Sequence, residues 1–452
     1  MAAVGDDWRR YPFELVAGDV QFRFPAAEAE HPDYESDTWF LAGELTGERS
    51  GRKFAFLTIF NKNRPRHTVV ADFYTFALFD LDHGTYATFT DYDMPPANLR
   101  PGAVPKLSSA VGHLDMAYQS STGTASWRTC RDERDQLVPY TYDVELVGTG
   151  RAGDAIGLGL HVTPTRAPVP VGASACNGEI TCFGQAGTYS YFQTGMAMSG
   201  TLRWGAVEET VGGEAGHVDR QWFPRYAGGG GTGDDPRACG HEWRTINLDN
   251  GVDLSIWRQF DRMSRNALQP FSGATTSPTA GEPEYADDID VAVASFVRWP
   301  QSVPTLLPPL SEARYMPDRH RLTSRQLDLD LVGEPLVAAP AHALPIEYME
   351  GPYRYQGTMR GRPASGFAFY ERSIAMYRDW ELLDVLEAAV GDAAMVAEVR
   401  RLIGAGLRDE AIACLEKVDA DSAQVAEIVA DLVTALRANS RSLKKPQPQP
   451  ES

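Results

Sequence analysis

Short alternating runs of apolar and polar residues fill the chain from about residue 37 to about residue 205. The segments DTWFLAGEL (37–45) and KFAFLTIF (53–60) are rich in aromatic and β-branched residues. The polar link between them, TGERSGR, contains two glycines and is typical of a hairpin. Many short strands separated by turn signals favour an antiparallel sandwich or barrel.

The same character returns after a change near Gly205 and continues to about residue 373. Strands are expected at Glu242–Leu248 and Asp253–Phe260, among others. Two β-domains in tandem are therefore the simplest architecture. We place them at residues 1–205 and 206–373.

From about Asp379 the apolar residues follow a helical period. WELLDVLEAAV, MVAEVRRLI and DSAQVAEIVADLVTALRAN carry apolar residues at i, i+3, i+4 and i+7. This pattern predicts a helical region at 374–440, which could pack on the β-domains or join two copies in a homodimer. The last residues, 441–452, are polar and proline-rich and are expected to be disordered.

Composition and charge indicate an ordinary globular protein that does not bind nucleic acid. Of the 452 residues, 43% are hydrophobic and 23% are charged, as is usual for globular chains. A formal charge of −19 without a basic stripe argues against contact with a phosphate backbone. The first residues lack the apolar core of a signal peptide, and no apolar run is long enough to span a bilayer. We expect a cytoplasmic protein.

The sequence shows no local motif for a metal or a cofactor. Its five cysteines are scattered, and neither CxxC nor HxxxH occurs, so no metal site is expected. Cys176 and Cys182 could pair across a hairpin, but reduced thiols are the simpler interpretation. There is no Gly-x-Ser-x-Gly elbow, and no dinucleotide-binding fingerprint opens a βαβ unit, which disfavours serine hydrolases and dehydrogenases. A mechanism without a cofactor remains.

The segment GHVDRQW (216–222) concentrates groups that transfer protons and stabilise cations. His217 and Asp219 share one face of a strand, whereas Arg220 points to the other. A buried Asp219 would stay protonated and could donate a proton, with Trp222 and Trp243 as the aromatic wall facing a cation. In the alternative, Asp219 forms a structural ion pair with an arginine, and the histidine and tryptophans are ordinary core residues.

Four further residues are candidates for substrate binding. Tyr189 and Tyr191 share a face of the preceding strand and would line a pocket. His241 precedes the Glu242-Trp243 pair, and Glu371 closes the last expected strand. Each has a structural alternative: aromatic core for the tyrosines, an exposed loop for His241, and an ion pair for Glu371.

Four segments resemble the carotenoid 1,2-hydratase (hydroxyneurosporene synthase) family and its lipocalin-like relatives, which include kievitone hydratase and decalin-forming Diels–Alderases. They are DTWFLAGELTGERSGRKFAFLTIFNK (37–62), TYSYFQTGMAMSGTL (188–202), GEAGHVDRQWF (213–223) and YMEGPYRYQGTMRGRPASGFAFYE (348–371). The third is similar to the family signature G-x-[AG]-x-x-D-[RH]-[EQ]-W. The resemblance implies two lipocalin-like β-domains in tandem, with a ligand site near the domain contact.

Three positions depart from the family pattern. His217 stands where an aromatic residue is common, Phe223 stands where glycine is usual, and Gln193 replaces a small hydroxyl residue. These changes fall where the resemblance places a ligand, so Gln193 joins the candidate substrate-binding residues. The resemblance therefore supports the fold more strongly than it supports the identity of the substrate.

The candidate residues and the resemblance favour a cofactor-independent enzyme for an apolar isoprenoid or polyketide-like substrate. Alkene hydration, in which protonation gives a tertiary carbocation that water then attacks, is the leading reaction. An isomerase or cyclase of the terpenoid cyclase or Diels–Alderase type is the alternative. The rival from another class is a non-catalytic lipocalin-type carrier, which needs the apolar cavity but not a carboxyl group with a raised pKa.

Overall fold

The computed structural model describes most of the chain. The described residues are 6–16, 18–92, 104–182, 185–225, 239–261, 272–304, 314–344, 347–373, 376–377, 379–420, 422–439 and 443. The tail expected to be disordered, 441–452, lies outside them apart from Leu443. Among the described helices, none is both long and apolar enough to cross a bilayer.

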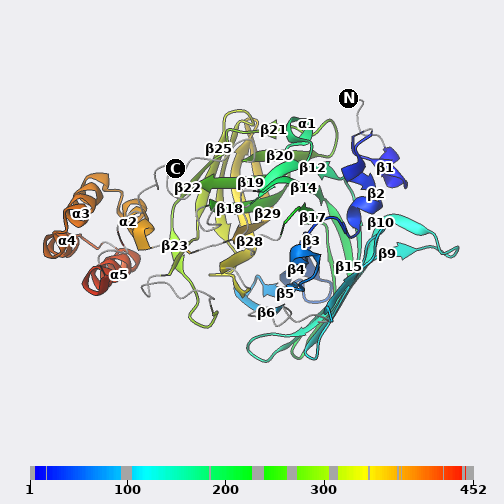
Figure 1. Cartoon of the computed structure of the whole chain (residues 1–452), viewed down its shortest axis with the longest axis horizontal. Helices are drawn as coiled ribbons and strands as arrows, with labels where there is room; N and C mark the ends of the chain where they lie inside the picture. The colour runs from blue at the N-terminus through cyan, green and yellow to red at the C-terminus, as the bar shows by residue number, and fades with distance from the viewer. Residues whose placement is uncertain are drawn as a thin grey trace.

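Strands from the first half of the chain form one strongly curled sheet (Figure 1). They are β3 (Ser36–Gly47), β4 (Lys53–Asn63), β5 (Phe73–Asp80), β6 (Thr85–Tyr92), β7 (Leu107–Ser109), β8 (Asp115–Gln119), β9 (Gly123–Arg131), β10 (Leu137–Thr149), β11 (Ala155–Pro164), β12 (Val169–Pro170), β13 (Glu179–Cys182), β14 (Gln185–Thr194), β15 (Met196–Trp204), β16 (Val207–Gly213) and β17 (Gly216–Phe223). The order is β12-β14-β17-β3-β16-β15-β11-β10-β9-β8-β7, with β4, β5 and β6 continuing from β3 and β13 beside β14.

The second half of the chain forms a second curled sheet. Its strands are β18 (Cys239–Leu248), β19 (Val252–Asp261), β20 (Gly273–Pro278), β21 (Tyr285–Ala286), β22 (Asp290–Val293), β25 (His320–Ser324), β26 (Leu329–Pro335), β27 (Ala341–Ala343), β28 (Glu347–Met359) and β29 (Arg362–Ser373). The order is β21-β20-β19-β18-β29-β28-β26-β25-β22, with β27 beside β28. Two short ribbons, β1 (Phe13–Glu14) with β2 (Arg23–Phe24) and β23 (Phe296–Arg298) with β24 (Tyr315–Pro317), complete the described strands.

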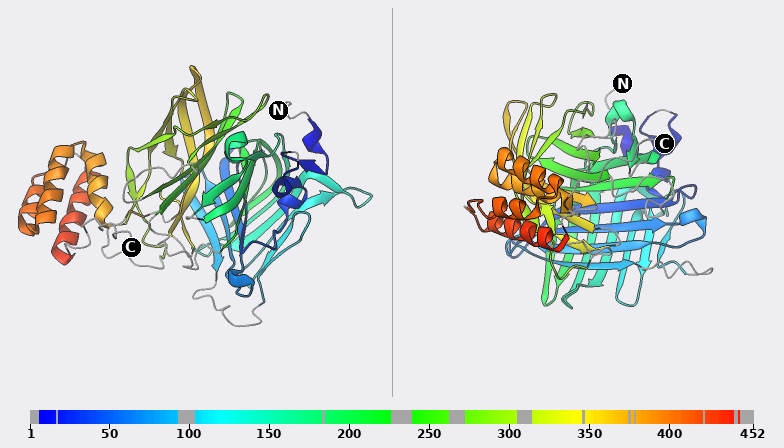
Figure 2. Two further views of the ribbon diagram at one scale, coloured as in Figure 1. Left: turned by 45° about the horizontal axis from the view of Figure 1, so that its top comes forward. Right: turned by 60° about the vertical axis from the view of Figure 1, so that its left-hand side comes forward.

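Four helices at the C-terminal end pack around their own apolar core. They are α2 (Leu382–Val390), α3 (Ala393–Ala405), α4 (Arg408–Leu415) and α5 (Ala423–Asn439), and α1 (Ala173–Cys176) lies in the first domain. Short 3-10 turns occur at Asp6–Arg9, Val20–Phe22, Ala26–Glu28, Pro65–His67 and Asp379–Glu381. Both figures place α2–α5 beside the second sheet and away from the first (Figures 1 and 2).

Burial along the strands distinguishes an outer wall from a shared interior. In β10 every second residue from Tyr140 to Gly148 is buried and the residues between them are exposed or half-buried, because only one face of that strand is covered. In β17 all eight residues are buried. Both faces of β17 are therefore covered, one by the interior of the first sheet and the other by the second sheet.

The contact between the two sheets has an apolar core of its own. It includes Phe40, Phe192, Trp243 and Phe369 from four strands, and separate cores fill the two curled sheets. Polar contacts join its edges. The Arg166 guanidinium lies 3.2 Å from the Asp253 carboxylate, the Arg354 guanidinium lies 3.0 Å from Glu44, and the Gly172 amide donates to the Thr275 hydroxyl at 2.8 Å.

The predicted fold class is confirmed, with one change in how the strands divide. The chain is mainly β, with two curled antiparallel sheets in tandem and a helical region after them. The boundary expected at residue 205 does not separate the two sheets, because β16 and β17 pair with β15, β3 and β14. The change of sheet falls between Phe223 and Cys239. Among the described residues, Cys176 and Cys182 are not joined by a disulfide.

Candidate active site

Two strands bring the central candidates together from opposite sides of the domain contact. β17 lies between β14 and β3, and its His217 ring contacts Trp243 and Phe369 of the second sheet. β29 lies between β28 and β18, and its residue Glu371 pairs in register with Trp243. Because side chains alternate along a strand, Asp219 shares the face of His217. The register of the two sheets thus determines which side chains meet.

Asp219 is a buried carboxyl group with neutral partners. Its side chain accepts a hydrogen bond from the Ser190 hydroxyl at 3.3 Å and another from the Gln221 amide. Only 2% of the residue is exposed. Among the described residues, its hydrogen-bond donors are thus a hydroxyl and an amide, which stabilise a carboxylate less than a cation would.

Two glutamates from the second sheet lie beside it. Glu350 and Glu371 are directly opposite each other in the register of β28 and β29. The Tyr348 hydroxyl donates to Glu350 at 2.7 Å, and the Ser373 hydroxyl donates to Glu371 at 2.8 Å. All four residues are buried. Three carboxyl groups, Asp219 included, therefore converge in one apolar interface.

Burial and mutual repulsion keep protons on this cluster. Burial raises the pKa of Asp219 to about 7, and the nearby charge of Glu371 contributes to that rise. Burial, followed by the charges of Glu371 and Asp219, raises the pKa of Glu350 well above its usual value. Burial also raises the pKa of Glu371. At neutral pH the cluster therefore holds protons that ordinary carboxyl groups would have released.

Aromatic rings surround the carboxyl cluster. The His217 ring stacks on Phe40 with centroids 5.1 Å apart and meets Trp243 edge-on at 5.0 Å. Burial lowers the pKa of His217 to about 3, so its imidazole is neutral. Phe40 also packs edge-on against Trp243, with centroids 5.4 Å apart. The wall beside the carboxyl groups is thus apolar and rich in aromatic faces.

Several buried polar atoms on the same face have no hydrogen-bond partner in the described part of the chain. They are His217 Nε2, Thr245 Oγ1, Trp257 Nε1, Glu350 Oε1 and both amide atoms of Gln259. Gln259 pairs in register with His241, which lies 3.6 Å from the Glu371 carboxylate. Buried polar atoms are rarely left unpaired in proteins. A bound molecule with oxygen atoms would supply the missing partners.

Five of the sequence candidates meet at this contact: Asp219, His217, Trp243, His241 and Glu371. His241 is 4% exposed, so the alternative of an exposed loop is wrong. Burial lowers the pKa of His241 to about 4, and its ring lies 4.6 Å from that of Trp257. The two histidines are therefore neutral groups that can donate or accept a hydrogen bond, but not resident cations.

The other four candidates lie on the opposite face of β14 and β17. Trp222, Tyr189 and Tyr191 pack in the interior of the first sheet, where Trp222 stacks on His31 with centroids 3.9 Å apart. Gln193 has the same parity as the tyrosines, and its amide donates to a backbone oxygen of the first domain at 2.8 Å. The expectation that Trp222 joins Asp219 in one wall is wrong, because an odd and an even position point to opposite sides.

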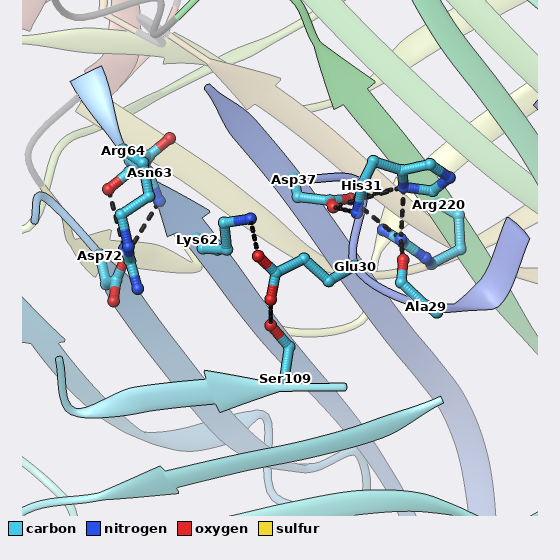
Figure 3. A network of polar contacts seen from close by, with 10 residues as sticks. All are labelled: Ala29, Glu30, His31, Asp37, Lys62, Asn63, Arg64, Asp72, Ser109 and Arg220. Atoms are coloured by element: carbon cyan, nitrogen blue, oxygen red, sulfur yellow. Dashed lines mark hydrogen bonds and ion pairs between the residues drawn. The ribbon is translucent and has the colours of Figure 1, made fainter. Parts of the chain in front are cut away.

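Arg220 points away from Asp219, which has no cationic partner among the described residues. Its guanidinium points into the first domain, where it lies 2.9 Å from Asp37 and donates to the backbone oxygen of Ala29 at 2.7 Å (Figure 3). It also lies 4.0 Å from the centre of the Trp39 ring. The alternative of an ion pair between Asp219 and an arginine is therefore wrong for the described residues. Arg220 instead joins the segment around Ala29 to β17 and to Asp37 of β3.

Sequence reasoning missed Glu350 and its partner Tyr348. Both lie in the quoted segment YMEGPYRYQG, and Glu350 precedes the glycine of that segment. The pairing of Glu350 with Glu371 depends on the register of β28 and β29, which alternation alone does not fix. The signal available in the sequence was the presence of two acidic residues, Glu350 and Glu371, on the two strands of one expected hairpin.

Among the described residues, one group of three side chains has ligand atoms that all lie within 4.8 Å of one another, as a metal ion would require. These are Cys130, Asp143 and His161 on the outer wall of the first sheet, and the carboxyl cluster is not part of that group.

Comparison with solved structures shows proteins of the same fold. An AttH-type protein from Nitrosomonas europaea has a TM-score of 0.58 at 18% identity, covering 81% of this chain and all of the other. Kievitone hydratase from Nectria haematococca has a TM-score of 0.55 at 13% identity, covering 80% of this chain and 98% of the other. Identities this low show the fold alone.

The sequence itself gives the family. Curated proteins offer no match, but the family model described as AttH-like matches residues 15–371. This range contains both sheets, the carboxyl cluster and the four segments that carried the resemblance, and the presence of kievitone hydratase among proteins of the same fold confirms that resemblance. The chain belongs to the AttH-like family.

Proposed function

We propose that this protein is a cofactor-independent enzyme that protonates a largely apolar substrate between its two β-domains. The observation that carries the proposal is the convergence of Asp219, Glu350 and Glu371 in a buried aromatic interface. An acid works best when its pKa lies near the working pH, because it is then protonated and still able to release the proton. Asp219, with a pKa raised to about 7, meets that condition.

The roles follow from position. Asp219 is the proton donor. Glu371 and Glu350 hold the protons that reprotonate it after each turnover. Phe40 and Trp243 present ring faces and edges beside the acid, where they would stabilise a developing cation by up to roughly 2 kcal/mol or more once water is excluded. His217 is a neutral hydrogen-bonding group at the same place.

The unpaired polar atoms support a substrate that carries oxygen. Gln259, Trp257 Nε1 and Thr245 Oγ1 are buried on the face shared with Glu371, and a carbonyl or hydroxyl group would satisfy them. A plain hydrocarbon would leave them unpaired, at roughly 1–3 kcal/mol for each group. We therefore favour an oxygenated isoprenoid or a polyketide-like molecule over an unfunctionalised polyene.

Hydration is the leading reaction, and cyclisation or isomerisation is the second candidate. Protonation of an alkene at Asp219 gives a tertiary cation, and attack by water with loss of a proton to the cluster completes the addition. Kievitone hydratase, which shares the fold, is named for a hydration. Its name supports placing hydration before cyclisation or isomerisation. Loss of a proton or internal ring closure from the same cation gives the second candidate. A carrier is the remaining alternative, and the raised pKa of Asp219 speaks against it.

Product analysis separates these outcomes. Purified protein is incubated with prenylated phenolic, polyene and polyketide-like candidates, and mass spectrometry distinguishes the gain of one water, an isomer of unchanged mass, and unaltered ligand. Asp219→Asn should lower turnover about 10²–10⁴-fold, as expected for loss of a general acid. Full turnover in folded Asp219→Asn protein would remove this site from consideration.

A matched control tests whether the loss of turnover depends on where the carboxyl group lies and not only on its burial. Glu28 is also buried, and burial raises its pKa to about 7, but it lies inside the first domain and accepts hydrogen bonds from the Tyr11 and Tyr142 hydroxyls. Glu28→Gln should keep the turnover of each folded molecule. Equal losses in both variants would mean that the assay reports folding and not acid catalysis.

A further inference from the structure

The outer wall of the first sheet carries a group of side chains that the proposed reaction does not use. Cys130 on β9, Asp143 on β10 and His161 on β11 lie on the solvent face of three neighbouring strands. The His161 Nδ1 atom lies 3.0 Å from Asp143 Oδ1 and 3.9 Å from Cys130 Sγ. All three ligand atoms lie within 4.8 Å of one another. One sulfur, one nitrogen and one oxygen thus point to a common centre.

The spacing lies close to, but not within, that of a tetrahedral metal site. Zinc binds thiolate sulfur at about 2.3 Å and nitrogen or oxygen at about 2.0–2.2 Å, so its ligands lie roughly 3.3–3.6 Å apart in a tetrahedron. The observed separations of 3.9 Å and 3.0 Å lie on either side of that range. The His161 side chain is 53% exposed and the Asp143 side chain 67% exposed, so both can move by a few tenths of an ångström without disturbing the core.

The charge of the cluster favours a cation, because the Asp143 carboxylate lies beside the His161 ring and the Cys130 sulfur. A divalent ion would neutralise this carboxylate and bind the sulfur as a thiolate. The nearby charged side chains of the wall include Glu145 and Arg128, and the Arg128 guanidinium is engaged with Asp115 at 2.9 Å.

The surroundings leave the cluster accessible. It lies in a groove of about 850 Å³ on the outer face of β8–β11 and β15. Gly157 and Gly159 on β11 and Ser199 and Thr201 on β15 line the groove with small side chains. An ion held by three protein ligands could therefore take its fourth ligand from water or from a solute.

We propose that Cys130, Asp143 and His161 form a zinc-binding site on the outer wall of the first domain, separate from the carboxyl cluster. A set of sulfur, imidazole and carboxylate ligands favours Zn²⁺ over Mg²⁺ or Ca²⁺, which prefer oxygen ligands only. The absence of CxxC or HxxxH from the sequence does not conflict with the site, because each ligand comes from a different strand. Bound zinc would cross-link β9, β10 and β11.

The test is metal binding by the full-length chain after treatment with a chelator. Isothermal titration with Zn²⁺ should give one tight site. Co²⁺ should give tetrahedral visible bands and a sulfur-to-cobalt charge-transfer band. Cys130→Ser and His161→Asn should weaken binding more than about 100-fold, since even loss of a partner outside the ligand shell can cost that much. Zn²⁺ should also raise the melting temperature of the wild type and not of these variants.

Two variants serve as controls. Glu145→Gln removes a neighbouring acidic group from the same groove, and Cys414→Ser removes a half-buried thiol from the helical region. Both should bind zinc like the wild type. Unchanged affinity in Cys130→Ser, loss of binding in Glu145→Gln alone, or no tight site in the wild type would each overturn the proposal. Circular dichroism of every variant shows that the folded chain is being compared.

Discussion

Replacing Asp219 by asparagine should stabilise the protein at neutral pH, even though it removes the proposed acid. In the unfolded chain water solvates Asp219, which then ionises at its usual pKa of 3.8, whereas burial raises the pKa in the folded protein to about 7. Folding therefore works against ionisation of this group over the whole interval between the two values. Asparagine has nearly the same shape and does not ionise, and the Gln221 amide can turn to keep a hydrogen bond with it.

The size of the effect follows from the shift in pKa. One unit corresponds to about 1.4 kcal/mol, so a rise of about three units destabilises the folded wild type by on the order of 4 kcal/mol at and above pH 7. For a raised folded pKa, stability is fully present below the unfolded value and is lost as the pH rises through the folded value. The stability of the variant relative to the wild type should thus be near zero around pH 4 and largest above pH 7.

Urea unfolding of both proteins at several pH values between about 4 and 9 measures this difference. Asp154→Asn is the control, since Asp154 is exposed, and it should change stability by less than about 0.5 kcal/mol. If Asp219→Asn is less stable than the wild type by a similar amount at every pH, the carboxylate is ionised and structural in the folded protein. That result would refute both the stability argument and the assignment of Asp219 as an acid.

Three other outcomes can be measured on single variants. Arg220→Met removes the cationic partner of the buried Asp37 carboxylate, which keeps its hydrogen bond from the His31 backbone amide, and should lower the free energy of unfolding by roughly 3–5 kcal/mol. Arg203→Met, which breaks an exposed pair on the same sheet, should change it by less than about 0.5 kcal/mol; similar losses would argue against a special role for Arg220. Gly200→Ala should fold poorly, because its methyl group would lie 1.9 Å from a backbone oxygen, whereas Gly404→Ala inside α3 should gain up to about 1 kcal/mol in a melting experiment. Turnover should fall as the pH rises through about 7, where Asp219 loses its proton, and a flat profile from pH 6 to 8 would contradict that assignment.

Alternation of apolar and polar residues was enough to predict the fold class but not the division between the sheets. The period of two identifies β15 as a strand, but it carries no information about which sheet the strand joins. β15 pairs with β16, which pairs in turn with β3, and that long-range contact depends on packing in the first domain. The boundary at residue 205 therefore followed a local change in composition, while the sheet continued to Phe223.

The candidate site was partly predictable for the same reason. Parity correctly places His217 and Asp219 on one face, and it also separates Trp222 from them, which the grouping of all three residues overlooked. Glu350 enters the site only through its register with Glu371, and Cys130 approaches His161 only because three strands lie side by side. Contacts of this kind depend on tertiary structure and leave no local pattern in the sequence.

The position of β17 in its sheet has a consequence for biosynthesis. It is the last strand of the first sheet to leave the ribosome, yet it pairs with β3, the first strand of that sheet, by placing Asp219 opposite Phe40. β29 likewise completes the second sheet by returning to β18. Contacts between such distant segments form slowly, because a long loop must close first. Each sheet therefore keeps an unpaired edge during synthesis until the strand that carries a carboxyl group of the candidate site has been made. The carboxyl groups come together only when the two sheets are complete.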